Sequence, residues 1–161
     1  MRALMRRAYS IYEMKRALEH KAERGDLVPP VLAKLRERNY LDDARFARTF
    51  ARQRATHRSQ GRYRIARELR ARGVADKYIE AACDEAFDES NEEEMLKKRL
   101  ERKLKLIRGP LDMRKRASLQ NNLLRSGFSS DMIRRAMRGI ASGTAPGDDM
   151  ELVDLETSGD E

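Results

Sequence analysis

The sequence predicts an all-α protein made of tandem three-helix units. Apolar residues recur three and four positions apart along most of the 161-residue chain, which is the spacing of helices with one buried face. Alternating apolar and polar runs are nearly absent and there is no Asn-Gly turn, so strands and hairpins are not indicated. One apolar pattern also occurs twice, around Gly73 and again around Gly127, 54 residues later.

The repeated pattern has five apolar positions around each glycine. An apolar residue lies eight positions before the glycine, a leucine four before, an apolar residue directly after, an isoleucine six after and an alanine nine after. These positions are Ile65, Leu69, Val74, Ile79 and Ala82 in one copy and Leu119, Leu123, Phe128, Ile133 and Ala136 in the other. Such a match predicts a shared supersecondary unit. We expect three repeats, over residues 1–41, 42–88 and 89–141, and then a disordered acidic tail over 142–161.

The first repeat carries a weaker copy of the pattern. It runs through Met14 and Leu18, with Ala22 in the place of the glycine. A short helix is expected over residues 1–8, and Ser10-x-x-Glu13 is a capping box that opens a second helix. Two prolines after a loop open a third helix. The residues expected to face inward there are Val31, Leu32 and Leu35.

The second repeat is expected to begin with a long helix capped by Asp42 and ending near Ser59. Its alanines form a flank of small residues where a neighbouring helix could approach closely. A second helix, over residues 62–72, should end at Gly73 in a Schellman motif with positive φ. The helix over 76–87 has an acidic outer surface.

The third repeat follows an acidic stretch in which we expect Glu92 to Glu94 to be solvated. Its first helix should bury Leu96, Leu100, Leu104 and Ile107. A second helix is expected over residues 112–126, with Gly127 repeating the glycine stop. A last helix is expected over 130–140.

Charge is distributed unevenly along the chain. The formal net charge is +8, but residues 142–161 hold seven acids and no Lys or Arg, which leaves +15 over residues 1–141. Such a body should attract polyanions, although an inert basic surface remains the alternative. The cations expected to face outward as candidates for binding an anionic partner are Arg45, Arg48, Arg52, Arg64, Arg67, Arg70, Lys98, Arg102 and Lys105.

Catalytic, cofactor and metal sites are not indicated, and we expect no enzyme. Two His and one Cys cannot form an ordinary zinc site within one chain, and no glycine-rich phosphate-binding motif occurs. The pair Asp42-Asp43 is better explained as a helix cap than as a metal site. Cys83 is expected in the core. No signal peptide or transmembrane span is indicated, so we expect a cytoplasmic protein with no membrane partner.

Two motifs in the second repeat resemble one family. They are LDD-x-RFA-x-x-F over residues 41–50 and G-x-x-x-I-x-x-EL-x-x-x-GV over 61–74. The chain resembles the RecX family of bacterial regulators of the RecA recombinase, with weaker similarity over 9–18 and 123–136. The resemblance implies a curved array of three three-helix repeats. The acidic tail departs from the family, and the segment before the first helix is shorter than usual.

The resemblance also implies a function. RecX proteins bind along the groove of the RecA–ssDNA filament and restrain ATP hydrolysis, strand exchange and repressor cleavage, and some members bind DNA directly. We therefore expect a monomeric regulator, most simply an inhibitor, whose partners are the RecA nucleoprotein filament and also ssDNA or dsDNA. The nine outward cations are then the candidates for contacting RecA or nucleic acid.

Two other functions stay open. Residues 68–82 superficially match a helix-turn-helix, which would give a DNA-binding protein that does not act on RecA. The second helix of that match is acidic, but its counterpart in the third repeat carries Arg134, Arg135 and Arg138. A helical protein adaptor that binds no nucleic acid is the third possibility.

Overall fold

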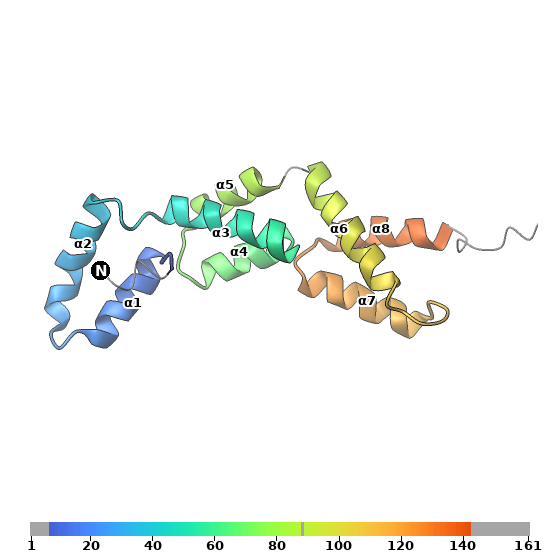
Figure 1. The fold of residues 1–161 in the computed structure, drawn as a ribbon, viewed down its shortest axis with the longest axis horizontal. Coiled ribbons are helices and arrows are strands. Elements are labelled where there is room, and N and C mark those ends of the chain that lie inside the picture. Colours follow the sequence, from blue (N-terminus) through green and yellow to red (C-terminus); the bar gives the residue numbers. More distant parts are fainter. Residues whose placement is uncertain (1–6, 88, 143–161) are drawn as a thin grey trace, which may run out of the picture.

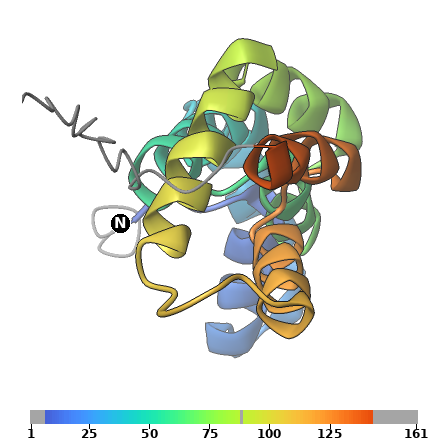
Figure 2. The ribbon, with the colours of Figure 1, turned by 90° about the vertical axis from the view of Figure 1, so that its right-hand side faces the viewer.

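In the computed structural model, residues 7–87 and 89–142 are described, and they form helices joined by short loops. The helices are α1 (Ile11–Lys21), the 3-10 helix η1 (Gly25–Leu27), α2 (Val28–Glu37), α3 (Asp43–Arg58), α4 (Arg62–Arg70), α5 (Asp76–Ala86), α6 (Glu89–Leu104), α7 (Met113–Arg125) and α8 (Ser130–Ser142). They follow one another as an elongated arch, with α1 and α2 at one end and α6 to α8 at the other (Figure 1). Viewed from the α6–α8 end, the three groups of helices lie one behind another (Figure 2).

The predicted all-α fold of three successive units is confirmed, and the described ranges contain no strand. The predicted boundaries of the units stay predictions. The tail predicted to be disordered lies outside the described residues, except that Ser142 ends α8. None of the described helices combines the length and apolarity needed to cross a lipid bilayer.

The second unit, α3 to α5, has its own core. Ala47, Ala51 and Ala55 of α3 are almost completely buried, and α3 packs most extensively against α5. Because these side chains are small, the two helices can approach closely, as the sequence predicts. Cys83 of α5 is buried in the same core, as expected, and burial raises the pKa of its thiol.

The third unit, α6 to α8, has a separate core that includes four positions of the repeated pattern, Leu119, Leu123, Phe128 and Ile133. Its buried residues are Leu96, Leu100, Leu119, Leu123, Phe128, Ile133 and Met137. Met95 packs against both this core and that of the second unit. Each unit therefore buries its own apolar residues and leans on its neighbour, as expected for a tandem array.

The first unit is smaller in the described part of the chain. Most of the predicted helix over residues 1–8 lies outside the described residues, and Arg7 and Ala8 are not helical. Val31, expected to face inward, is exposed, because α2 packs mainly on α1 and buries a narrow stripe centred on Val28. The capping box of Ser10 and Glu13 is present at the start of α1.

Two glycines end the middle helices of the second and third units as the sequence predicts. Gly73 has φ of +71° and Gly127 has φ of +95°. After α4, the N–H of Val74 donates to the carbonyl of Leu69 at 3.2 Å, and the N–H of Gly73 donates to the carbonyl of Arg70 at 2.9 Å. These are the two hydrogen bonds of a Schellman motif, and the corresponding pair follows α7.

The start of α4 is joined to the third unit by a set of hydrogen bonds. The N–H of Gly61 donates to the carbonyl of Ser126 at 2.9 Å, and the N–H of Tyr63 donates to the carbonyl of Gly127 at 3.0 Å. The N–H of Arg62 donates to Oε1 of Glu92 at 2.9 Å. The expectation that Glu92 is solvated is therefore wrong, because this carboxylate is buried between the units and satisfies the first helical N–H of α4.

The start of α1 is joined to the second unit in the same manner. Oγ of Ser10 donates to the carbonyl of Arg72 at 2.6 Å, and the N–H of Ile11 donates to Oδ1 of Asp43 at 2.9 Å. At both joints a carboxylate from the first helix of one unit accepts the first N–H of a helix in the preceding unit. The predicted cap is formed by Asp42 alone, which accepts the N–H groups of Ala44 and Arg45.

Candidate functional site

A basic groove runs along the solvent side of α3. It consists of two adjoining hollows of about 400 and 340 Å³ that share Arg7, Phe46 and Thr49 in their walls. We call these hollows the α3 groove. Its basic lining residues are Arg7, Arg45, Arg54, His57, Arg58 and Arg72. Asp42, at one end, is the only acid that lines it within the described part of the chain.

Two guanidinium groups stack on an aromatic ring in the floor of the groove. The Cζ of Arg54 lies 4.7 Å from the centre of the Phe50 ring, and the Cζ of Arg72 lies 5.0 Å from it. Phe50 in turn stacks on Phe46, with 5.9 Å between the ring centres. Each guanidinium group also pairs with an acid, Arg54 with Glu68 and Arg72 with Glu13, so the cation–π contacts and the ion pairs together fix their positions. The Nε of Arg72 is buried without a hydrogen-bond partner among the described residues.

The basic surface continues from the end of α3 onto α6. Nη1 of Arg99 donates to the carbonyls of Arg58 and Ser59 at 3.4 and 3.3 Å, and Nη2 of Arg102 donates to Oγ of Ser59 at 3.4 Å. Burial lowers the pKa of Arg99, and the charges of Arg102 and Arg64 lower it further. Because like charges are held together here, a bound anion would relieve their repulsion.

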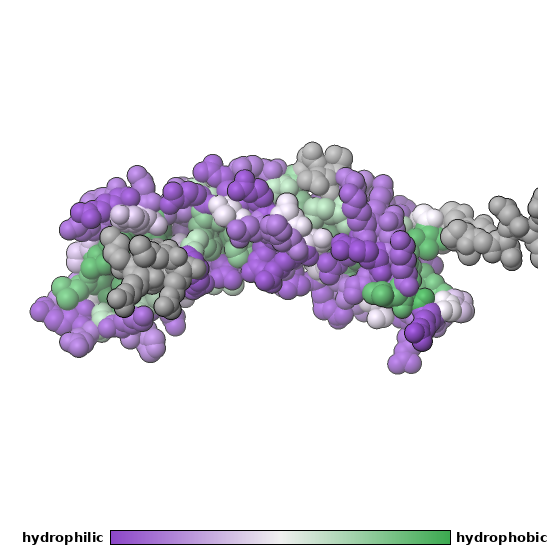
Figure 3. Space-filling model, viewed as in Figure 1, coloured by the Kyte–Doolittle hydropathy of each residue, from purple (hydrophilic) through white to green (hydrophobic). Residues whose placement is uncertain are grey.

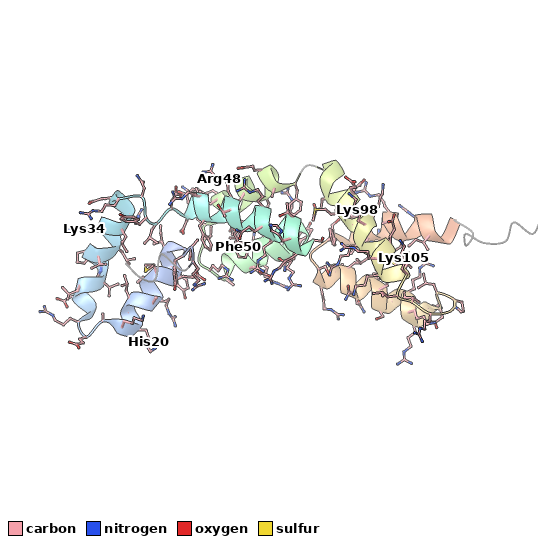
Figure 4. All side chains as sticks on the ribbon, in the orientation of Figure 1. His20, Lys34, Arg48, Phe50, Lys98 and Lys105 are labelled. Atoms are coloured by element: carbon pink, nitrogen blue, oxygen red, sulfur yellow. The ribbon has the colours of Figure 1, made fainter. Side chains whose placement is uncertain are left out.

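Side chains labelled in Figure 4 show how this surface is arranged. Arg48 lies toward α5 and Phe50 toward the other side of α3, while Lys98 projects from α6 and Lys105 from the turn directly after it (Figure 4). Hydrophilic residues cover most of the visible face over α3 and α6 (Figure 3). We call the exposed cations of α3, of α6 and of the turn after α6, together with the α3 groove, the basic face.

The nine predicted cations fall into two groups. Arg52, Arg67 and Lys105 are exposed and make no side-chain hydrogen bond or ion pair with the described residues. Arg45 donates only to the carbonyl of Asn39, at 2.9 Å, and Arg102 donates only to oxygens of Lys98 and Ser59. Within the described ranges, these five cations keep their charge unneutralised by a neighbouring carboxylate.

The other four predicted cations pair with acids. Their partners are Glu85 for Arg48 at 4.0 Å, Glu68 for Arg64 at 3.0 Å, Asp76 for Arg70 at 2.7 Å and Glu94 for Lys98 at 2.6 Å. A neighbouring acid, Asp84, pairs instead with Arg62 at 2.8 Å. The nine cations therefore do not form one cluster of equally available charges.

The α3 groove was not predicted from the sequence. Phe50, Arg54 and Arg58 are four residues apart and share one side of α3, so their spacing could have indicated a basic aromatic stripe. Arg72 follows α4, and only the tertiary structure brings it over Phe50. The side of α3 that is buried against α5 is formed by alanines, which leaves the two phenylalanines between core and groove.

The helix that would enter DNA in a helix-turn-helix is acidic on its surface. Asp76, Glu80, Asp84 and Glu85 of α5 are all exposed. In α8, Arg134 pairs with Asp131 and Arg135 pairs with Glu93, each at 3.2 Å. Neither helix presents the set of unneutralised cations that DNA phosphates favour.

No group of three or more His, Cys, Asp or Glu among the described residues is placed to hold a metal ion. The arrangement instead offers many N–H donors along an extended surface. Arginine can form paired hydrogen bonds with either phosphate or carboxylate, and a basic groove with stacked aromatic rings is typical of sites for extended anionic chains.

Comparison with known proteins identifies the family. Residues 42–82 match the model of the second three-helix domain of RecX, and residues 91–137 match that of the third. Regulatory protein RecX of Halorhodospira halophila is 36% identical over 137 residues, which span 84% of this chain and 82% of that protein. RecX of Stenotrophomonas maltophilia is 33% identical over 137 residues, spanning 84% of this chain and 80% of the relative.

Solved structures show the same fold. A crystal structure of regulatory protein RecX superposes with a TM-score of 0.75 at 23% identity, covering 84% of this chain and 66% of that one. The chain thus spans about two thirds of the length of that protein. RecX from Lactobacillus salivarius superposes with a TM-score of 0.70 at 20% identity, covering 87% of this chain and 90% of that one. From its sequence matches and its fold, the chain belongs to the RecX family of regulatory proteins.

Proposed function

We propose that this chain is a non-enzymatic regulator that binds the RecA–ssDNA filament in the cytoplasm through its basic face and restrains the recombinase. Membership of the RecX family supports a regulatory role. The main support for this binding surface is the α3 groove, where the guanidinium groups of Arg54 and Arg72 stack on the ring of Phe50. Asp42 is the only acid among its described lining residues. Arg7 and Arg72 also pair with Glu13, and Arg54 pairs with Glu68, but the cations still outnumber these acids, so the field there favours an anionic partner.

The arch shape suggests how binding could restrain the filament. The basic face extends over two units, from the α3 groove to the end of α6 (Figure 4). An elongated surface of this kind can contact several RecA subunits, or several phosphates, at once. Contacts that bridge neighbouring subunits oppose their relative movement, so they would slow steps that need such movement. ATP hydrolysis and strand exchange are the steps that the family resemblance implies.

Inhibition of RecA ATPase on ssDNA tests this proposal. Three triple variants each replace one predicted set of cations with glutamine. The α3 variant alters Arg45, Arg48 and Arg52, the α4 variant alters Arg64, Arg67 and Arg70, and the α6 variant alters Lys98 and Arg102 of α6 and Lys105 directly after it. We expect the α3 and α6 variants to lose most inhibition, because these sets border the basic face. The α4 variant should keep more, because two of its three arginines are already paired with acids.

A matched control removes the same charge elsewhere. Lys15, Lys21 and Lys34 are exposed on α1 and α2, and their replacement by glutamine lowers the net charge by the same three units. This variant should inhibit as well as the unchanged chain, and all variants should melt normally. Equal loss in control and α3 variants would mean that only total charge matters. Full inhibition by every variant would show that none of these nine cations is needed for binding.

A further inference from the structure

An apolar hollow with a basic rim lies in the third unit, apart from the basic face. It has a volume of about 410 Å³ and is formed by the end of α6, the connection to α7 and one side of α7. Leu106, Ile107 and Leu119 supply its apolar walls, and Lys103, Arg114 and Lys115 supply its charge. Leu106 is 76% exposed, which is unusual for a leucine beside a core residue such as Leu119, itself only 5% exposed. Figure 3 shows hydrophobic surface at this end of the molecule.

The hollow lacks acids in its described lining, and this distinguishes it from its neighbour. A second hollow, between the second and third units, is lined by the acids Glu92, Glu93 and Asp131 and by Arg62 and Arg135. Because its acids outnumber its bases, it is less favourable for an acidic chain than the hollow between α6 and α7, whose charged lining residues are all basic. A suitable occupant would therefore combine acidic and apolar residues.

The sequence after α8 has this composition. Residues 148–156 read DDMELVDLE, with five acids interleaved with Met150, Leu152, Val153 and Leu155. No Lys or Arg occurs between Gly143 and Glu161. In its chemistry this segment complements the hollow, offering apolar side chains for the walls and carboxylates for the basic rim.

The chain between the end of α8 and residues 148–156 is long enough for this segment to reach the hollow. Nη2 of Arg116 donates to the carbonyl of Met137 at 3.1 Å, so the second half of α8 lies against the first turns of α7. That part of α7 also carries Arg114 and Lys115 of the hollow's rim. From the end of α8 at Ser142 to Met150 the chain can span roughly 26 Å when extended, because each residue spans about 3.3 Å.

We propose that residues 148–156 dock intramolecularly in the hollow between α6 and α7. Because the segment is tethered to the same chain, its effective concentration at the hollow is in the millimolar range, so even a weak contact would be well populated. Docking would place acidic charge beside the end of α6, where Lys98 and Arg102 of the helix and Lys105 directly after it belong to the basic face. In consequence, and resting on the proposed function, the docked segment would compete with the anionic partner for the third unit.

A single tryptophan can report docking without RecA. The chain contains no Trp, so the full-length Leu155→Trp variant carries one fluorophore in the segment. We expect blue-shifted emission and weaker quenching by acrylamide than in a free peptide of residues 143–161 with the same substitution. High salt should shift the emission toward that of the peptide, since the rim contacts are electrostatic.

Two variants with equal charge change locate the contact. Leu106→Asp alters an exposed wall residue of the hollow, and Leu124→Asp alters an exposed residue of α7 outside it. Leu106→Asp should release the tryptophan and Leu124→Asp should not. Emission equal to that of the free peptide in the unaltered background would overturn the proposal. Release by both variants or by neither would overturn the site, and loss of protection on dilution would show docking into a second copy instead.

Discussion

At the scale of single residues, three glycines show two different reasons why a position needs glycine: a left-handed backbone conformation, and a neighbour too close to leave room for a Cβ. Gly109 has φ of +73°, and an added Cβ would meet only the Nζ of Lys115 at 3.8 Å. Gly61 has an ordinary φ of −78°, but an added Cβ would clash with the backbone carbonyl of Gly127. Gly127 combines both requirements, with φ of +95° and an added Cβ that would clash with Arg64. The last two glycines thus allow the close approach of the second and third units.

Alanine substitutions at these glycines should therefore have graded effects on stability. Gly109→Ala should lower the free energy of unfolding by about 1 kcal/mol through left-handed strain alone. Gly61→Ala should cost about 1–3 kcal/mol through overpacking of the joint. Gly127→Ala should cost most, about 2 kcal/mol or more. A valine at a fourth glycine should be costly as well. Gly73→Val should lower the free energy of unfolding by about 1 kcal/mol or more, because the left-handed backbone strains a valine and an added Cβ would also clash with Tyr12. Thermal and urea melts measure all four, and a Gly127→Ala loss no larger than that of Gly109→Ala would contradict the close approach.

At the scale of elements, Glu68 ties α4 to α3. Its carboxylate lies 3.6 Å from Nε of Arg54 in α3 and 3.0 Å from Nε of Arg64 in its own helix. Nε2 of Gln60, between the two helices, also donates to it at 3.3 Å. Burial tends to raise the pKa of Glu68, but the two arginines and Gln60 outweigh it, so the pKa is lowered. Arg54 also carries the cation–π contact in the α3 groove, so Glu68 helps to position a residue of the basic face.

The lowered pKa of Glu68 predicts a pH-dependent effect of its replacement. Because the folded state holds the carboxylate ionised, its contribution is present above the ordinary pKa of the group and is lost as pH falls through the lowered pKa. Glu68→Gln should cost up to about 1 kcal/mol at neutral pH, and the cost should shrink in acid. Melting temperatures of both proteins across the acidic range test this. A difference that stays constant with pH would show that the carboxylate acts by packing alone.

The joints between units show which features of the structure could be predicted from the sequence and which could not. The cap at Asp42, the capping box at Ser10 and the glycine stops depend on residues a few positions away, so their local spacing predicted them. Asp43 and Glu92 could not be placed in this way, since they accept N–H groups 32 and 30 residues away. The α3 groove was missed for the same reason, as Arg72 reaches Phe50 only in the folded chain. Contacts between units join residues that are far apart in the chain, so they produce no regular spacing that a single sequence could reveal.

At the scale of the whole molecule, charge is separated between the body and the last residues. The formal charge is +15 over residues 1–141 and −7 over 142–161. Opposite charges on one chain attract each other, so we expect the acidic residues to screen the body partly from outside anions. The described part of the chain therefore has a stronger field than the net charge of +8 indicates.

Neutralising the acids should strengthen binding to anions. Replacing all seven acids of residues 142–161 with Asn or Gln should tighten ssDNA and filament binding severalfold at low salt, and the gain should fade at high salt as screening increases. Fluorescence anisotropy with labelled ssDNA measures this. A control variant corrects for the general change of net charge. It neutralises five exposed acids elsewhere: Asp76, Glu80, Asp84 and Glu85 of α5, and Asp26 of η1. Equal gains per charge in both variants would show that the acids after α8 have no special role.

Salt dependence can decide which anion the basic face meets. If the cations of α3 bind phosphates, each bound phosphate releases counterions, and the logarithm of the binding constant falls linearly with the logarithm of the salt concentration. Replacing Arg45, Arg48 and Arg52 by glutamine should then reduce the slope by roughly one unit for each phosphate that is no longer bound. Arg48 is already paired with Glu85, so we expect the reduction to come mainly from Arg45 and Arg52. Titrations of ssDNA at several salt concentrations give the slope, and the first-unit control variant should leave it unchanged. An unaltered slope for the α3 variant, together with a loss of RecA inhibition, would identify carboxylates of the RecA protein as the partner of these arginines.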